Sequence, residues 1–282
     1  MTSAISIKHL TQTFPDRATG GRFVALDDVT LDVPAGQFIS LVGPSGCGKS
    51  TLLDLVAGLT TPTTGEVTLD GRPVTGPGLD RGVVFQQYAL FPWRTAQANI
   101  EFGLEEKRIP RRERAERARE MLELVGLSAF ADRYPHELSG GMKQRVAIAR
   151  SLAYEPGVLL MDEPYAALDA QTREALQDDL LGIWRRTGTT IVFITHAIEE
   201  AVYLSQRVAV MTSRPGRIKE IVEIQHDGHH DADHVTGSSG AAAAEDRRSS
   251  PAFVEQRHEI WKLLQDEVAR SQHTVAIAGA AS

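Results

Sequence analysis

Short apolar runs alternate with longer amphipathic stretches along most of this chain. Five apolar runs are rich in β-forming residues and predict strands: Gln37–Gly43, Gly82–Gln86, Val158–Asp162, Thr189–Thr195 and Arg207–Thr212. Residues 49–59 and 111–125 predict helices, the second through its helical period and its Ala, Glu, Arg and Leu content. Because short apolar strands separated by helices are typical of parallel sheets covered on both faces, we predict an α/β fold with a mostly parallel sheet core.

Two additions to this core are expected from changes in the pattern. Three segments predict a small antiparallel β subdomain: Ile5–Phe14, Thr30–Val33 and Glu66–Leu69. Between residues 88 and 140 helix-favouring residues replace the apolar strands, which indicates an inserted helical subdomain. We expect all of these parts to form one domain over residues 1–225.

The chain after Gln225 has a different character. Residues 226–250 are polar and of low complexity, so we predict a flexible linker. Its histidines at 226, 229, 230 and 234 match no compact zinc spacing. Residues 251–282 predict a C-terminal helix and tail that pack back on the body. The expected apolar face of this helix consists of Ile260, Trp261, Leu263, Leu264 and Val268.

Composition and charge exclude several classes of protein. The net charge of −7 gives no electrostatic case for nucleic-acid binding. The longest apolar runs are far too short to cross a bilayer, and the first residues do not resemble a signal peptide. Cys47 is the only cysteine, so no intramolecular disulfide can form and a reducing compartment fits best.

The stretch GPSGCGKST at residues 43–51 matches the phosphate-binding pattern GxxxxGK[ST]. Its glycines let backbone N–H groups turn toward phosphate oxygens, Lys49 adds a charge, and the Ser50 hydroxyl can bind Mg²⁺. It also follows a predicted strand and precedes a predicted helix, as phosphate binding at a helix N-terminus requires. The predicted nucleotide-binding residues of this loop are Gly43, Pro44, Ser45, Gly46, Cys47, Gly48, Lys49, Ser50 and Thr51.

The thiol of Cys47 lies inside this loop. Loop N–H dipoles are expected to stabilise its thiolate form. We therefore expect alkylation of Cys47 to inhibit the protein and a bound nucleotide to protect it.

A second chemical feature is the run VLLMDEP at residues 158–164. An apolar strand that ends in two adjacent acids places one carboxylate near Mg²⁺ and the next beside the terminal phosphate. Asp162 is the expected metal residue, and Glu163 is expected to orient or deprotonate the attacking water. An acidic strand end without catalytic duty is the alternative, and the phosphate loop makes it less favoured.

The order of these motifs resembles that of the ATP-binding cassette (ABC) family. GPSGCGKST is followed by VFQ (84–86), LSGGMKQR (138–145), VLLMDEP, ALD (167–169) and a histidine at 196. The resemblance extends over residues 5–225 and implies a P-loop NTPase cassette with ATP and Mg²⁺ as cofactors. Met142 stands where the family's signature usually has glutamine.

The resemblance implies further roles. Gln86 is similar to the glutamine that binds Mg²⁺ and senses the γ-phosphate, and His196 to the histidine that contacts the γ-phosphate. Phe14 resembles the aromatic residue that stacks on adenine, with Phe23 as its rival. Asp169 resembles the aspartate of the loop that follows the catalytic glutamate.

The family also implies that the chain works in a pair. Two cassettes meet head to tail, as a homodimer or with a related cassette, and Ser139, Gly140 and Gly141 contact the ATP of the opposite cassette. The other implied partners are membrane permease subunits and, indirectly, a periplasmic or lipid-anchored solute-binding protein. Residues after Gln86, especially Tyr88, Phe91, Pro92 and Trp93, are expected to receive a short helix of the permease, although Phe91 could instead be core.

The segments 76–93 and 196–218 and the terminal helix resemble nitrate, sulfonate and taurine importers. This implies an ATPase peripheral to the cytoplasmic face of the membrane. The alternatives are a cassette of another ABC importer and a non-transport ABC ATPase. The second is less favoured because residues 51–138 contain no long heptad run.

Overall fold

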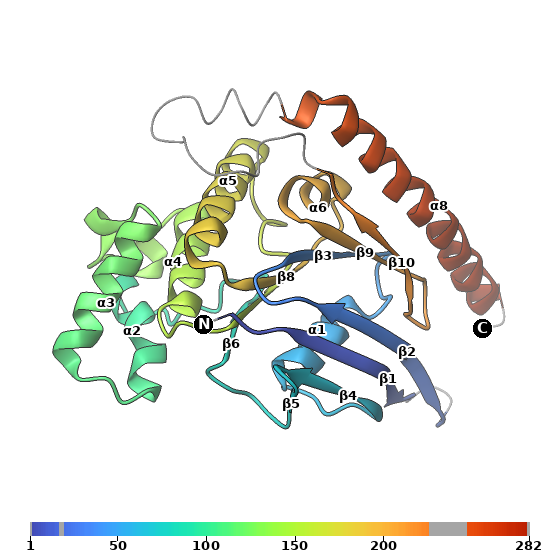
Figure 1. Ribbon diagram of the computed structural model, residues 1–282, viewed down its shortest axis with the longest axis horizontal. Coiled ribbons are helices and arrows are strands. Elements are labelled where there is room, and N and C mark those ends of the chain that lie inside the picture. The colour runs from blue at the N-terminus through green and yellow to red at the C-terminus, as the bar shows by residue number, and fades with distance from the viewer. Residues whose placement is uncertain (1, 17–19, 226–246, 281–282) are drawn as a thin grey trace. The chain divides into compact units, whose positions relative to one another are not determined.

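The structure, a computed structural model, describes residues 2–16, 20–225 and 247–280 (Figure 1). The chain divides into two compact units. The first unit contains the residues up to Ala4, Pro34–Gln37 and Pro77–Val192, and the second contains Ile5–Val33, Phe38–Gly76 and the chain from Phe193 onward. Each unit is therefore assembled from segments that are far apart in the sequence.

The second unit contains a four-stranded sheet in the order β2-β1-β4-β5. Its strands are β1 (Ile5–Pro15), β2 (Arg22–Val33), β4 (Thr64–Leu69) and β5 (Arg72–Pro73). All neighbouring strands are antiparallel. The antiparallel sheet expected from the sequence is confirmed, but β2 begins eight residues before Thr30 because it continues its pairing with β1 as far as Arg22.

The same unit also contains parallel strands. β3 (Phe38–Val42) pairs in parallel with β9 (Arg207–Met211), and β10 (Ile218–Glu223) pairs antiparallel with β9. Every residue of β3 is buried, as its continuous apolar sequence predicts. The helices of this unit are α1 (Lys49–Ala57), α6 (Ile198–Leu204) and α8 (Pro251–Ala280), and α8 contacts α6 and β9.

In the first unit β6 (Arg81–Val84) and β7 (Val158–Asp162) are parallel neighbours. Strand β8 (Thr190–Ile194) begins in this unit and ends in the second. The helices are α2 (Ala96–Glu106), α3 (Arg111–Leu124), α4 (Gly140–Leu152) and α5 (Ala170–Thr187), with 3₁₀ turns at Ser128–Phe130 and Pro135–Glu137. Helices α2, α3 and α4 contact one another. Helices α2 and α3 lie within the helical region expected between residues 88 and 140, whereas α4 begins where that region ends. The α/β class with a mostly parallel sheet, an antiparallel sheet and added helices is thus confirmed.

The predicted apolar face of the terminal helix is partly wrong. Ile260 is fully buried, but Trp261 is 45% exposed and Val268 is 41% exposed. Between residues 251 and 269, the part of α8 whose side chains are described, the buried positions are Phe253, Gln256, Ile260 and Glu267. They are separated by three, four and seven residues and form one face, whereas Trp261 and Val268 lie seven residues apart on another. A polar residue, Glu267, therefore takes a place in the packed face.

Most of the predicted linker, with its four histidines, lies outside the described residues. Among the helices that are described, none is both long enough and apolar enough to cross a membrane.

Candidate nucleotide site

The phosphate loop connects the buried end of β3 to the start of α1. Gly46 and Gly48 have φ values of 74° and 102°, which side chains with a Cβ rarely adopt. No side chain caps the N-terminus of α1, whose preceding residue is Gly48. The first N–H groups of the helix are therefore available to an anion, and the helix dipole favours one there.

Lys49 is held inside the loop rather than extended into solvent. Its Nζ donates hydrogen bonds to the carbonyl oxygens of Gly43, at 2.8 Å, and Pro44, at 3.2 Å. The residue is only 7% exposed. Ser50, by contrast, is exposed at the first turn of α1, where its hydroxyl can reach a metal bound to the phosphates.

The expectation of a stabilised Cys47 thiolate is wrong. The side chain is 1% exposed, and burial raises the pKa of the thiol above its ordinary value of 9.0. Lys49, whose Nζ lies 3.8 Å from the Sγ atom, opposes this effect but does not overcome it. A Cβ at Gly43 would lie 2.8 Å from the same sulfur, so the thiol fills space next to the loop backbone. Cys47 is thus a packed residue of the loop.

The two candidates for adenine stacking form one aromatic pair. Phe14 and Phe23 are cross-strand partners of β1 and β2, and their ring centroids are 5.8 Å apart. Both residues are half-exposed. The guanidinium of Arg214 lies 4.8 Å from the centroid of Phe23. Sequence reasoning treated the phenylalanines as rivals because it could not determine the register of β1 and β2.

His196 follows β8 and is exposed in the same unit as the phosphate loop. The turn before it is fixed by Thr195, whose Oγ1 donates to Glu200 Oε2 at 2.6 Å and accepts from Ala197 N at 3.0 Å. Strand β8 and these hydrogen bonds therefore fix the backbone on both sides of His196.

In the first unit two predicted site residues leave the sheet at the same edge. Val84 of β6 is the register partner of Met161 of β7. Gln86 and Glu163 each lie two residues further on, beyond the carboxyl ends of parallel strands, where ligands of α/β sheets usually bind. Gln86 is exposed, and Glu163 is half-buried with a left-handed φ of 43°. A left-handed glutamate costs conformational energy, and such residues gather at functional sites.

The signature motif forms the N-terminus of α4. The Ser139 hydroxyl accepts a hydrogen bond from Met142 N at 3.3 Å and caps the helix. A Cβ at Gly141 would lie 2.8 Å from Thr172 Cγ2, so α5 requires a glycine there. Asp169 in turn caps α5 by accepting from Thr172 N at 3.0 Å, and this hydrogen bond lowers the pKa of its carboxyl. Two helix N-termini therefore lie close together.

The predicted residues thus fall into two groups. Phe14, the phosphate loop and His196 belong to the second unit, while Gln86, Asp162, Glu163, Ser139 to Gly141 and Asp169 belong to the first. Ser50 of the second unit and Gln86 and Asp162 of the first carry hydroxyl, amide and carboxylate oxygens, and oxygen atoms of these kinds are the ligands that Mg²⁺ prefers. Within the described residues no cluster of three His, Cys, Asp or Glu side chains offers a competing metal site.

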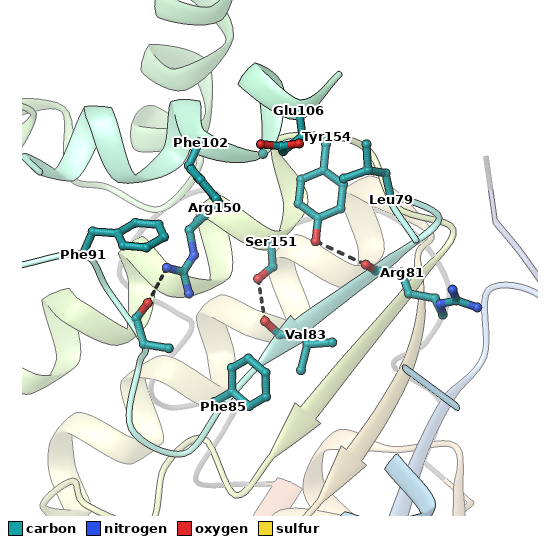
Figure 2. A pocket seen from close by; sticks show the side chains of 12 residues that line it. Leu79, Arg81, Val83, Phe85, Phe91, Phe102, Glu106, Arg150, Ser151 and Tyr154 are labelled. Atoms are coloured by element: carbon teal, nitrogen blue, oxygen red, sulfur yellow. Dashed lines mark hydrogen bonds between the residues drawn. The ribbon is translucent and has the colours of Figure 1, made fainter. Parts of the chain in front are cut away.

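The first unit also contains a largely apolar groove of about 450 Å³, shown in Figure 2. The Arg150 guanidinium donates to the carbonyl oxygens of Ala89, at 2.6 Å, and Tyr88, at 3.1 Å, and lies 5.9 Å from the ring centroid of Phe91. Burial raises the pKa of Tyr154, also in the groove, to about 12. The principal side chains of the lining are Leu79, Phe85, Phe91, Phe102, Arg150 and Tyr154.

Of the four residues singled out after Gln86, one lines this groove. Phe91 lines the groove, but Tyr88, Pro92 and Trp93 do not. Trp93 is 71% exposed, and its ring centroid lies 5.5 Å from that of Phe91. The sequence did not indicate the contributions of α2 and α4, because those residues are distant in the chain.

The chain is similar in sequence to known proteins along most of its length. Residues 26–166 match the family model described as ABC transporter. The chain is 48% identical over 258 residues to the nitrate import ATP-binding protein NrtD of Synechocystis sp., covering 92% of this chain and 94% of that protein. It is 49% identical over 245 residues to the taurine import ATP-binding protein TauB of Rhizobium johnstonii, covering 86% and 90%.

A solved structure extends the likeness to the fold. The ATP-binding cassette MJ0796, a dimer in a post-hydrolysis state bound to ADP and Pi, is similar with a TM-score of 0.69. The identity is 35%, and the match covers 78% of this chain and all but 1% of the other.

Proposed function

Because this chain belongs to the ABC transporter family and is an ATPase, we propose that it is the ATP-hydrolysing subunit of an importer for a small anionic or zwitterionic solute. The observation that carries the proposal is the phosphate loop, with Lys49 enclosed among backbone carbonyls at the start of α1. Nitrate and taurine are the cargoes named for the two relatives, and they define the class proposed here.

The loop side of the site binds the phosphate chain. A triphosphate offers its oxygens to the N–H groups of residues 46–51 and to the Lys49 ammonium, which then exchanges its carbonyl partners for phosphate. Phe14 stacks on the adenine. Mg²⁺, held by Ser50, Asp162 and Gln86, would neutralise charge that develops on the phosphates.

Glu163 and His196 act in the hydrolysis step. Glu163 accepts a hydrogen bond from the attacking water and orients it toward the γ-phosphate. His196 contacts the γ-phosphate and reports its presence. Once the γ-phosphate has left, its contact with His196 is lost, and the two paired cassettes separate again.

A second cassette completes each site. The N-terminus of α4, with exposed Ser139, points its N–H groups and positive dipole end toward the nucleotide of the partner. The dimeric state of the structurally similar cassette supports this pairing. The groove of the first unit receives a helix of the permease, which holds the ATPase at the cytoplasmic face of the membrane, and a solute-binding protein delivers the cargo.

The test is the replacement Glu163→Gln, which keeps the shape and removes the carboxylate. We expect ATP binding to persist, turnover to fall about a hundredfold or more, and a stable ATP-bound dimer to accumulate on gel filtration. Glu116→Gln on α3 is the control, because Glu116 is an exposed glutamate in a surface ion pair. A Glu163→Gln protein that stays monomeric with ATP and hydrolyses it at the wild-type rate would refute the proposal.

A further inference from the structure

The turn between β9 and β10, residues 212–217, packs against the phosphate loop. A Cβ at Gly216 would collide with the carbonyl oxygen of Cys47, so only glycine fits there. Gly216 N donates to Ala25 O at 2.9 Å, and Gly216 O accepts from Asp27 N at 3.0 Å. These contacts bring the turn into direct contact with the loop and fix it to β2.

The opposite side of the turn is fixed to α8. Ser213 N and Oγ donate to Glu267 Oε2 at 2.9 and 3.1 Å, and Lys219 Nζ lies 3.1 Å from Glu267 Oε1. Within the turn, Thr212 Oγ1 accepts from Arg217 N at 2.9 Å. The backbone on both sides of residue 214 is therefore held by hydrogen bonds.

Arg214 projects from this fixed turn toward the site. Its guanidinium lies over the ring of Phe23, and its Nη2 would be 3.7 Å from a Cβ placed on Gly46. The side chain is exposed, and no carboxylate within the described residues pairs with it. The cation thus lies between the aromatic pair and the backbone of the phosphate loop.

We propose that Arg214 is a further nucleotide-binding residue whose guanidinium contacts the phosphate chain. A guanidinium stacked on an aromatic ring is fixed in its plane and still presents its N–H edge to an anion. Hydrogen bonds between arginine and phosphate are charge-assisted and short. The position of the guanidinium next to Gly46 of the phosphate loop favours a contact with the phosphates over one with the base. This inference rests on the proposed nucleotide site around Lys49.

The experiment measures displacement of a fluorescent ATP analogue from the full chain in EDTA, where hydrolysis stops. For Arg214→Gln we expect the Kd of ATP and of ADP to rise about tenfold, while the Kd of adenosine changes less than about twofold. For Arg214→Lys, which keeps the charge, the Kd of ATP should rise about threefold. The melting temperature without nucleotide should match wild type, because the side chain is exposed.

The control is Arg112→Gln, which removes the same charge from a side chain that is 93% exposed on α3. An ATP affinity of Arg214→Gln equal to that of the control would overturn the inference. An equal loss for adenosine would also overturn it, because the contact would then be with the base. Lys49→Ala tests the underlying site separately: if it abolishes ATP binding while Arg214→Gln binds normally, the proposed function stands and Arg214 has no part in it.

Discussion

Cys47 lies between two glycines of the phosphate loop, where its sulfur is buried and lies 3.8 Å from Lys49 Nζ. The thiolate is the reactive form of cysteine, and both burial and a raised pKa reduce its population at neutral pH. The nearby ammonium of Lys49 lowers the pKa, but desolvation by burial is the larger effect and the pKa stays raised.

We predict slow labelling of Cys47. Iodoacetamide should modify it at least about tenfold more slowly than glutathione at pH 7, and the rate should continue to rise with pH above 9. Mass spectrometry of the intact chain gives the rate directly, since Cys47 is the only cysteine. If Cys47 is labelled rapidly at pH 7 and ATP blocks the labelling, the hypothesis of a reactive thiolate is supported and the buried position of the sulfur is contradicted.

Single residues also mark the limit of prediction from sequence. Asp162 and Glu163 were recognisable because an apolar strand ends there. The sequence could not predict the left-handed backbone of Glu163, because it depends on the following turn. It also could not predict the pairing of Phe14 with Phe23, because this depends on strand register. Arg214 was missed since a lone exposed arginine has no distinguishing sequence pattern.

At the scale of elements, α8 is joined to the β9–β10 turn through a buried carboxylate. Burial alone raises the pKa of Glu267, but hydrogen bonds from Ser213 and the charge of Lys219 outweigh it and lower the pKa below its ordinary value of 4.5. The fold therefore stabilises the charged form. The contribution of this carboxylate to the free energy of unfolding is fully present above about pH 4.5 and is lost as the pH falls through the lowered pKa.

We predict that Glu267→Gln lowers the free energy of unfolding by about 1–2 kcal/mol at pH 7, because a buried charge-assisted hydrogen bond is lost. The difference from wild type should shrink as the pH falls below 4.5. Urea unfolding at pH 7 and pH 3.5 measures it. The control Asp266→Asn, 74% exposed and 3.8 Å from Lys219, should have little effect. A loss that is the same at both pH values would show that the charge of Glu267 contributes nothing.

The groove of the first unit is the second element-scale feature. Phe85 lines it and is 40% exposed, whereas Phe130, 37% exposed in the same unit, does not line it. We predict that Phe85→Ser reduces co-purification with the permease subunits about tenfold and leaves ATP binding unchanged. Phe130→Ser should behave as wild type. If both variants lose co-purification to the same extent, the groove is not part of the permease interface.

For the whole molecule, the alternation of strand and helix patterns predicted the fold class because each element has its own hydrophobic period. It could not predict the division into two units, since that depends on contacts between distant segments. Residues 34–37 belong to the first unit although both neighbouring strands belong to the second. No local pattern in those four residues indicates this.

The parallel pairing of β3 with β9 sets an order of events during synthesis. Strand β3 ends at Val42 and its neighbour β9 begins at Arg207. A ribosome that adds about 5–20 residues per second needs roughly 10 to 30 seconds to make the chain between them. The antiparallel strands β1, β2 and β4 all lie within the first 69 residues and can pair early. The phosphate loop, attached to β3, therefore leaves the ribosome long before the strand that completes its support.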